Sequence, residues 1–133
     1  MSKTLIVGFM KESESSNNFL LGKYSVKSEL FPDEWFFPSV LDHNDEESAL
    51  DLLNKHAVEQ FGMDFWLRVW YPERDIVWKG EVYKVSLLEG VLIHGIFEIR
   101  SGSIYEATRW TRSLPTDTDY LIFMRKILNM TSF

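Results

Sequence analysis

The sequence WFFPSVLDHNDEESALDLLNKHAVEQFGM, residues 35–63, joins a short aromatic strand to the clearest helix of this 133-residue chain. Within 45–62, apolar residues recur at steps of three and four, the spacing of one helix face: Ala49, Leu50, Leu53, Ala57, Val58 and Phe61. Asn44 or Asp45 can cap the start, and Gly62 suits the position just past the end. The pattern predicts an amphipathic helix over 45–62.

Strand-like patterns fill the sequence on both sides of this helix. They cover 3–10, 19–26 and 35–38 before it, and 63–71, 76–78, 81–88, 91–100 and 104–111 after it. A second amphipathic helix is predicted over 117–129, with Thr116 as its N-cap. The order of strands, helix, strands and helix predicts one α+β domain, residues 1–133, built on a mixed sheet.

Composition restricts the classes of partner. The chain has 14 Lys+Arg against 20 Asp+Glu, a net charge of -6, which argues against broad, sequence-independent binding to DNA phosphates. It has no cysteine, which excludes disulfides, thiolate zinc sites and a cysteine nucleophile. No apolar run approaches the roughly 18 residues of a membrane span, and no export signal is evident. We therefore expect a cytoplasmic protein without a membrane partner.

The stretch 35–63 resembles the motif of the Nudix hydrolase superfamily. The matching residues are Trp35, Phe37 and Pro38 in the lead-in, Glu46 or Glu47 with Ser48 and Ala49 at the helix start, and Glu59, Phe61, Gly62 and Met63 at its end. The resemblance implies a Nudix-like α/β/α sandwich, in which helices 45–62 and 117–129 cover opposite sides of a mixed β-sheet. It also implies hydrolysis of nucleoside diphosphates linked to another moiety, with magnesium held by glutamates of the first helix.

The departures from that motif fall on the residues that the resemblance assigns to the metal. Lys55 stands in place of the family arginine, and His56 and Gln60 replace two of the three helix glutamates, so that Glu59 alone survives. Positions 56, 59 and 60 share one helix face. Magnesium prefers oxygen ligands, and each missing charge at ~4 Å removes several kcal/mol of Coulomb attraction at an effective dielectric of ~20. The resemblance therefore places His56, Glu59 and Gln60 at a former catalytic cluster and predicts that it binds magnesium poorly.

Two other readings of the acidic residues stay open. Glu46 and Glu47 could join Glu59 in an alternative cradle for Mg²⁺ or Mn²⁺, or they could form a solvated helix N-terminus. His56 with Glu59 could be a residual metal pair, or the two could lie on an exposed polar face.

Aromatic residues are unusually numerous, with five Trp, five Tyr and ten Phe. On a regular strand Trp66 and Trp70 share one face, opposite Phe65 and Leu67. That face is a candidate platform for stacking a nucleobase, with Arg68 to contact phosphate and Trp110 nearby. The alternative divides these aromatics between the core and the interface of a homodimer.

Three hypotheses follow. The leading one is a Nudix-fold protein that lacks standard magnesium-dependent pyrophosphohydrolase activity and binds a nucleotide-like ligand or a protein partner. The second is a divergent active hydrolase that recruits Glu46, Glu47, Asp42 or a strand glutamate such as Glu98 or Glu106. The third is a small accessory or inhibitory protein-interaction factor.

Overall fold

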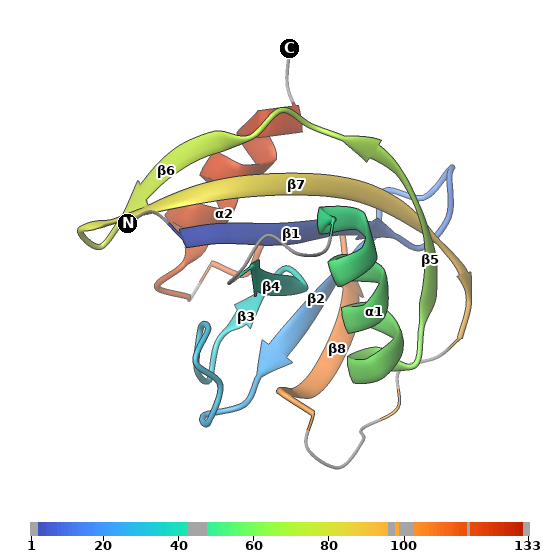
Figure 1. The fold of residues 1–133 in the computed structure, drawn as a ribbon. Helices are drawn as coiled ribbons and strands as arrows, with labels where there is room; N and C mark the ends of the chain where they lie inside the picture. Colours follow the sequence, from blue (N-terminus) through green and yellow to red (C-terminus); the bar gives the residue numbers. More distant parts are fainter. Residues whose placement is uncertain (1–2, 43–47, 96–97, 99–102, 117, 132–133) are drawn as a thin grey trace.

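The computed structural model describes residues 3–42, 48–95, 98, 103–116 and 118–131. Its strands are β1 (Lys3–Lys11), β2 (Phe19–Tyr24), β3 (Trp35–Phe36), β4 (Ser39–Asp42), β5 (Asp64–Trp70), β6 (Arg74–Trp78), β7 (Glu81–His94) and β8 (Tyr105–Thr111). Its helices are α1 (Ala49–Phe61) and α2 (Leu121–Leu128), and a 3₁₀ turn, Asn129–Thr131, follows α2 (Figure 1).

The described strands form one mixed sheet, as predicted. β1 and β7 run parallel through its centre, with Lys3 opposite Tyr83 and Lys11 opposite Val91. The central path is β3-β2-β1-β7-β5, while β4 pairs with β1, β6 with β7 and β8 with β2, all antiparallel. The fully buried Leu5, Ile6 and Val7 show why β1 reads as an apolar run, since both of its faces are covered.

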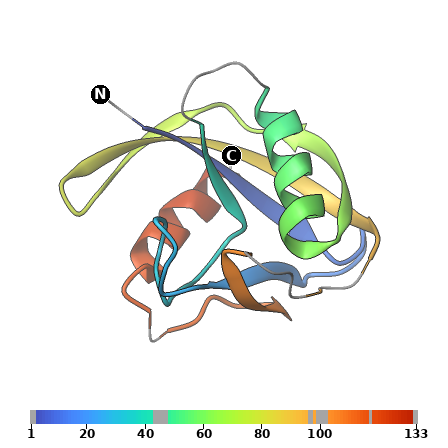
Figure 2. The ribbon, with the colours of Figure 1, turned by 60° about the horizontal axis from the view of Figure 1, so that its bottom comes forward.

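The two helices pack on opposite faces of the β1–β7 pair. Leu53 of α1 lies over Gly8, where an added Cβ would approach the Leu53 side chain to 3.1 Å. Phe123 of α2 contacts Tyr83, with ring centroids 5.4 Å apart. Gly8 pairs with Leu88, and residues 83 and 88 of a strand point to opposite sides. Figure 2 shows α1 in green and α2 in orange-red on either side of this pair, which confirms the predicted sandwich.

Both helices are shorter than predicted at their N-termini. Helix α1 begins at Ala49, where the Ser48 hydroxyl accepts a hydrogen bond from the Asp51 amide, so the predicted caps Asn44 and Asp45 are wrong. Its C-terminal glycine is confirmed, because Gly62 has a φ of 70°. Helix α2 begins at Leu121 without a side-chain cap.

The strand boundaries also differ in two places. The residues after Pro38 form β4, which pairs with β1 and was not predicted. The two strands predicted over 81–88 and 91–100 are one long strand, β7, in which Gly90 continues the pairing with β1. No helix among the described residues is long and apolar enough to cross a membrane.

Candidate functional site

The histidine at the position that the resemblance assigns to a former metal cluster contacts a buried tyrosine. His56, in the third turn of α1, places Nε2 2.6 Å from the hydroxyl of Tyr105, the first residue of β8. The Tyr105 ring fits against Gly22 of β2, where an added Cβ would come within 2.5 Å of the ring. The absence of a side chain at Gly22 therefore allows Tyr105 to reach α1.

Tyr105 is the centre of a hydrogen-bond network that links α1 to the segment after β3. Its hydroxyl donates to the Tyr24 hydroxyl at 3.3 Å, and Tyr24 donates to the carbonyl of Phe37 at 2.6 Å. The amide of Ser39 donates to Tyr105 at 3.4 Å. The donor and acceptor roles in the His56–Tyr105 hydrogen bond depend on which imidazole nitrogen carries the proton.

Burial keeps this network uncharged. Desolvation lowers the pKa of His56 from 6.5 to about 4. Burial also raises the pKa of the Tyr24 and Tyr105 hydroxyls above their ordinary value, so both remain protonated phenols at neutral pH. The position that the resemblance assigns to a metal-binding carboxylate thus holds a neutral imidazole within a neutral cluster.

The other two positions of the motif differ from each other. The Gln60 side chain accepts a hydrogen bond from the Ile104 amide at 3.0 Å, and the Gln60 carbonyl accepts one from the Ser103 hydroxyl at 3.4 Å. Gln60 therefore fastens the segment before β8 to the end of α1. Glu59 is exposed to solvent.

These residues do not fit a magnesium site. Mg²⁺ requires several oxygen ligands in a near-octahedral arrangement, and the face offers one exposed carboxylate beside an imidazole engaged with a phenol. Across the described ranges, no three His, Cys, Asp or Glu side chains come together as a metal-binding group. Glu46 and Glu47 lie outside the described residues. Of the strand glutamates, Glu106 is exposed on β8 and Glu98 is exposed beyond the end of β7.

The predicted tryptophan platform is divided by a β-bulge. Trp66 and Trp70 are both 55% exposed, as expected for residues outside the core. However, Trp66 pairs with Val91 and Trp70 with Leu88, because the register shifts between Leu67 and Val69. The extra residue, Arg68, changes the alternation, so the prediction of a shared face is wrong.

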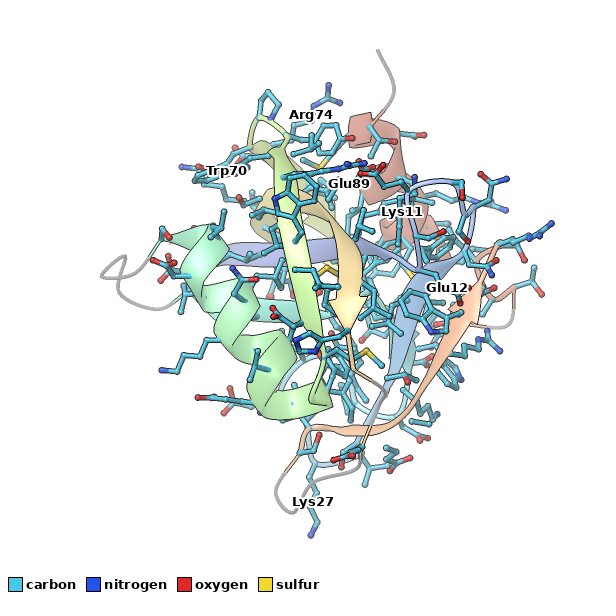
Figure 3. All side chains as sticks on the ribbon, turned by 90° about the vertical axis from the view of Figure 1, so that its right-hand side faces the viewer. Lys11, Glu12, Lys27, Trp70, Arg74 and Glu89 are labelled. Carbon is cyan, nitrogen blue, oxygen red and sulfur yellow. The ribbon has the colours of Figure 1, made fainter. Side chains whose placement is uncertain are left out.

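The two indoles consequently have separate neighbours. Trp70 lies on the α1 side of the sheet, opposite Glu89 (Figure 3), and its Nε1 donates to the Ser86 hydroxyl at 2.8 Å beside a hollow of about 330 Å³. Trp66 lies on the other side, beneath the guanidinium of Arg68, which is paired with Glu14. Trp110 lines a third region, a shallow hollow of about 620 Å³ before α2. Of the four residues predicted to bind ligand, Trp66 and Arg68 are therefore in contact, whereas Trp70 and Trp110 line separate hollows.

One aromatic pocket was missed by the sequence analysis. It has a volume of about 250 Å³ and lies between the loop 29–32, the β6–β7 hairpin and the start of α2. Its walls include the rings of Phe31, Trp78, Tyr83 and Tyr120. These residues are remote from one another in sequence and follow no common motif, so only the folded chain identifies them as a group.

Comparisons with known proteins identify the fold. No family model matches the chain, and no curated protein matches its sequence. Among solved structures, a UDP-X diphosphatase aligns with a TM-score of 0.74 at 13% identity, covering 98% of this chain and 62% of that protein.

Two further structures cover nearly their full length. A MutT Nudix hydrolase from Burkholderia pseudomallei aligns with a TM-score of 0.70 at 14% identity, covering 95% of this chain and 97% of its own. A Nudix hydrolase from Nitrosomonas europaea aligns with a TM-score of 0.70 at 10% identity, covering 98% and 90%. The chain therefore has the Nudix hydrolase fold.

Proposed function

We propose that this Nudix-fold chain is a binding module for a small nucleotide-like ligand and does not carry out magnesium-dependent hydrolysis of phosphoanhydrides. The observation that carries the proposal is the use made of positions 56 and 60. His56 and Gln60 hold hydrogen bonds to Tyr105 and Ile104, so each has a structural partner where a metal-dependent hydrolase would need a carboxylate free to bind its ion.

The energetics support the same conclusion. The neutral imidazole of His56 offers a divalent cation no charge attraction, and its Nε2 is already hydrogen-bonded to Tyr105. Glu59 would supply a single negative charge in solvent, where Coulomb attraction is weak. Neither group can replace the two missing carboxylates.

The direct test is a hydrolysis assay over a panel of nucleoside diphosphate derivatives with Mg²⁺ and with Mn²⁺. UDP-sugars belong in the panel because one structural neighbour is a UDP-X diphosphatase. We expect no product above the protein-free blank. Turnover of about 1 s⁻¹ or faster, abolished by Glu59→Gln, would reject the proposal.

A divergent hydrolase is the second candidate, and the exposed Glu59 is the observation that favours it. It requires divalent-ion binding by the free chain or by its complex with nucleotide. Calorimetry with Mn²⁺, with and without UDP-glucose, separates it from the leading proposal, which predicts no heat of metal binding beyond that of a protein-free control.

A protein-interaction factor is the third candidate, supported by the exposure of Trp66 and Trp70. Because the bulge directs the two indoles to opposite sides of the sheet, a single partner surface would engage one of them. Trp66→Ala and Trp70→Ala should then differ in their effect on complex formation.

A further inference from the structure

A polar hollow of about 330 Å³ lies at the start of α1, roughly 16 Å along the helix axis from Gln60. Its volume is at the lower end of the roughly 300–1,000 Å³ typical of small-molecule sites, which is room for one ring of a ligand. The polar and aromatic side chains of its walls are Thr4 of β1, Asp42 of β4, Trp70 of β5, Glu73 of the β5–β6 connection, and Lys84 and Ser86 of β7.

Trp70 presents the one indole that no ring or cation covers in the described part of the chain. Trp66 is equally exposed, at 55%, but the guanidinium of Arg68 lies 5.4 Å from its ring. The remaining indoles also have such neighbours: Arg109 at Trp35, Lys79 and Tyr120 at Trp78, and Phe65 at Trp110. The Trp70 indole, open beside a hollow, is therefore available to stack on a ligand.

A buried serine holds this indole in place. Ser86 is 2% exposed, between the fully buried Val85 and Leu87 of β7, and its hydroxyl accepts a hydrogen bond from Trp70 Nε1 at 2.8 Å. A buried hydroxyl costs free energy unless it is hydrogen-bonded, and alanine would fill the same position without that requirement. The hydroxyl thus serves to orient the indole. Because the indole is ordered in advance, a ligand that stacks on it loses little side-chain entropy.

The charges around the hollow favour an uncharged ligand with hydroxyl groups. Asp42 and Glu73 carry two negative charges against the one positive charge of Lys84, which disfavours a phosphate. The ammonium group of Lys84 in turn disfavours a cation on the indole. Carboxylates accept hydrogen bonds, an ammonium group donates them, and the Thr4 hydroxyl does both. The walls therefore match a ligand that is itself both a donor and an acceptor.

We propose that this hollow binds one ring of a neutral sugar, a hexopyranose. The C–H face of the sugar stacks on the Trp70 indole, and its hydroxyl groups donate to Glu73 and accept from Lys84 and Thr4. An aliphatic ring would leave the charged walls without partners, whereas a sugar has both an apolar face and hydroxyl groups around its rim. The site is separate from the His56 network and adds a saccharide to the nucleotide-like ligand proposed above.

The test is saturation-transfer difference NMR on the full chain with D-glucose and with D-galactose. Irradiation of the protein should transfer signal to the C–H protons of at least one of the two sugars, because those protons lie against the indole. The transfer should saturate with a Kd of about 1 mM. D-glucose 6-phosphate should bind about tenfold more weakly than D-glucose, since the carboxylates of the hollow repel its phosphate.

Matched variants separate the hollow from the rest of the surface. Trp70→Ala should abolish the transfer, whereas Trp66→Ala, which removes an equally exposed indole from the same strand, should leave it unchanged. Ser86→Ala keeps the indole but releases its N–H, and should weaken sugar binding about threefold or more.

Three results overturn the assignment. The first is the absence of transfer to either sugar at about 10 mM, ten times the expected Kd. The second is transfer that Trp66→Ala reduces as much as Trp70→Ala does. The third is tighter binding of tetramethylammonium than of both sugars, which would make the hollow a cation site. None of these results depends on hydrolysis or on metal binding, so failure of the sugar site and failure of the proposed function are distinguishable.

Discussion

The folding stability of the chain should depend on pH through His56. Burial lowers the pKa of His56 from 6.5 to about 4, so the unfolded chain takes up a proton at a pH where the folded chain does not. The contribution of neutral His56 to the free energy of unfolding is fully present above pH 6.5 and is lost as pH falls toward 4. The difference of about 2.5 pH units corresponds to about 3 kcal/mol, of which about 2 kcal/mol disappears between pH 7 and pH 5.

Urea unfolding of the wild type and of His56→Gln at pH 7, 6 and 5 measures the part of the free energy of unfolding that His56 makes pH-dependent. Glutamine is neutral throughout and can still offer a polar atom to Tyr105, so its stability should fall by about 2 kcal/mol less than that of the wild type. Carboxylates titrate equally in both proteins and cancel in the comparison. His94→Gln is the matched control, since His94 is exposed on β7 and should leave the wild-type slope intact.

The reasoning is refuted if His56→Gln keeps the wild-type pH slope, or if His94→Gln removes it. A second measurement uses the wild type alone, so it does not require the variant to fold. In the wild type, the ring proton signals of His56 should hold their positions from pH 7 to pH 5.

The remaining predictions concern the same region. Tyr105→Phe removes the hydrogen-bond partner of His56 and should lower the free energy of unfolding by about 1–3 kcal/mol, measured in urea at pH 7; an unchanged value would contradict the network. Gly22→Ala places a Cβ 2.5 Å from the Tyr105 ring and should cost about 1–3 kcal/mol in the same assay, whereas a neutral effect would show that the ring can move. His56→Glu with Gln60→Glu restores three carboxylates with Glu59 and should bind Mn²⁺ in calorimetry, whereas we expect no heat from the wild type; binding by the wild type would contradict the proposed function.

The layered fold could be predicted from the sequence because the patterns that indicate its helices and strands are local. The apolar stripe of 45–62 has the period of a helix, and Leu53, Ala57 and Phe61 are the buried residues that produce it. The helix start was misplaced because several residues between 44 and 48 can act as caps, and Ser48 was selected by the folded structure. The length of β7 was missed because pairing with β1 overrides the weak strand propensity of Gly90.

The candidate site could be predicted only in part, because its contacts join residues that are distant along the chain. The motif located positions 56, 59 and 60 on one helix, but the partner of His56 is Tyr105, 49 residues away along the chain. The bulge at Arg68 depends on how β5 registers against β7, which residue alternation alone does not encode. Residues that meet only through tertiary contacts, such as Phe31 and Trp78, carry no spacing that a single sequence reveals.

The bulge at Arg68 also affects the outer edge of β5. Among the described strands, β5 pairs only with β7, so its outer margin could serve as a template for a strand of another molecule. With indoles as large as Trp66 and Trp70 exposed along it, a straight β5 would be an aggregation hazard. The inserted residue bends β5 and interrupts its pattern of hydrogen bonds. A bent edge strand is a poorer template for pairing with a strand of another molecule.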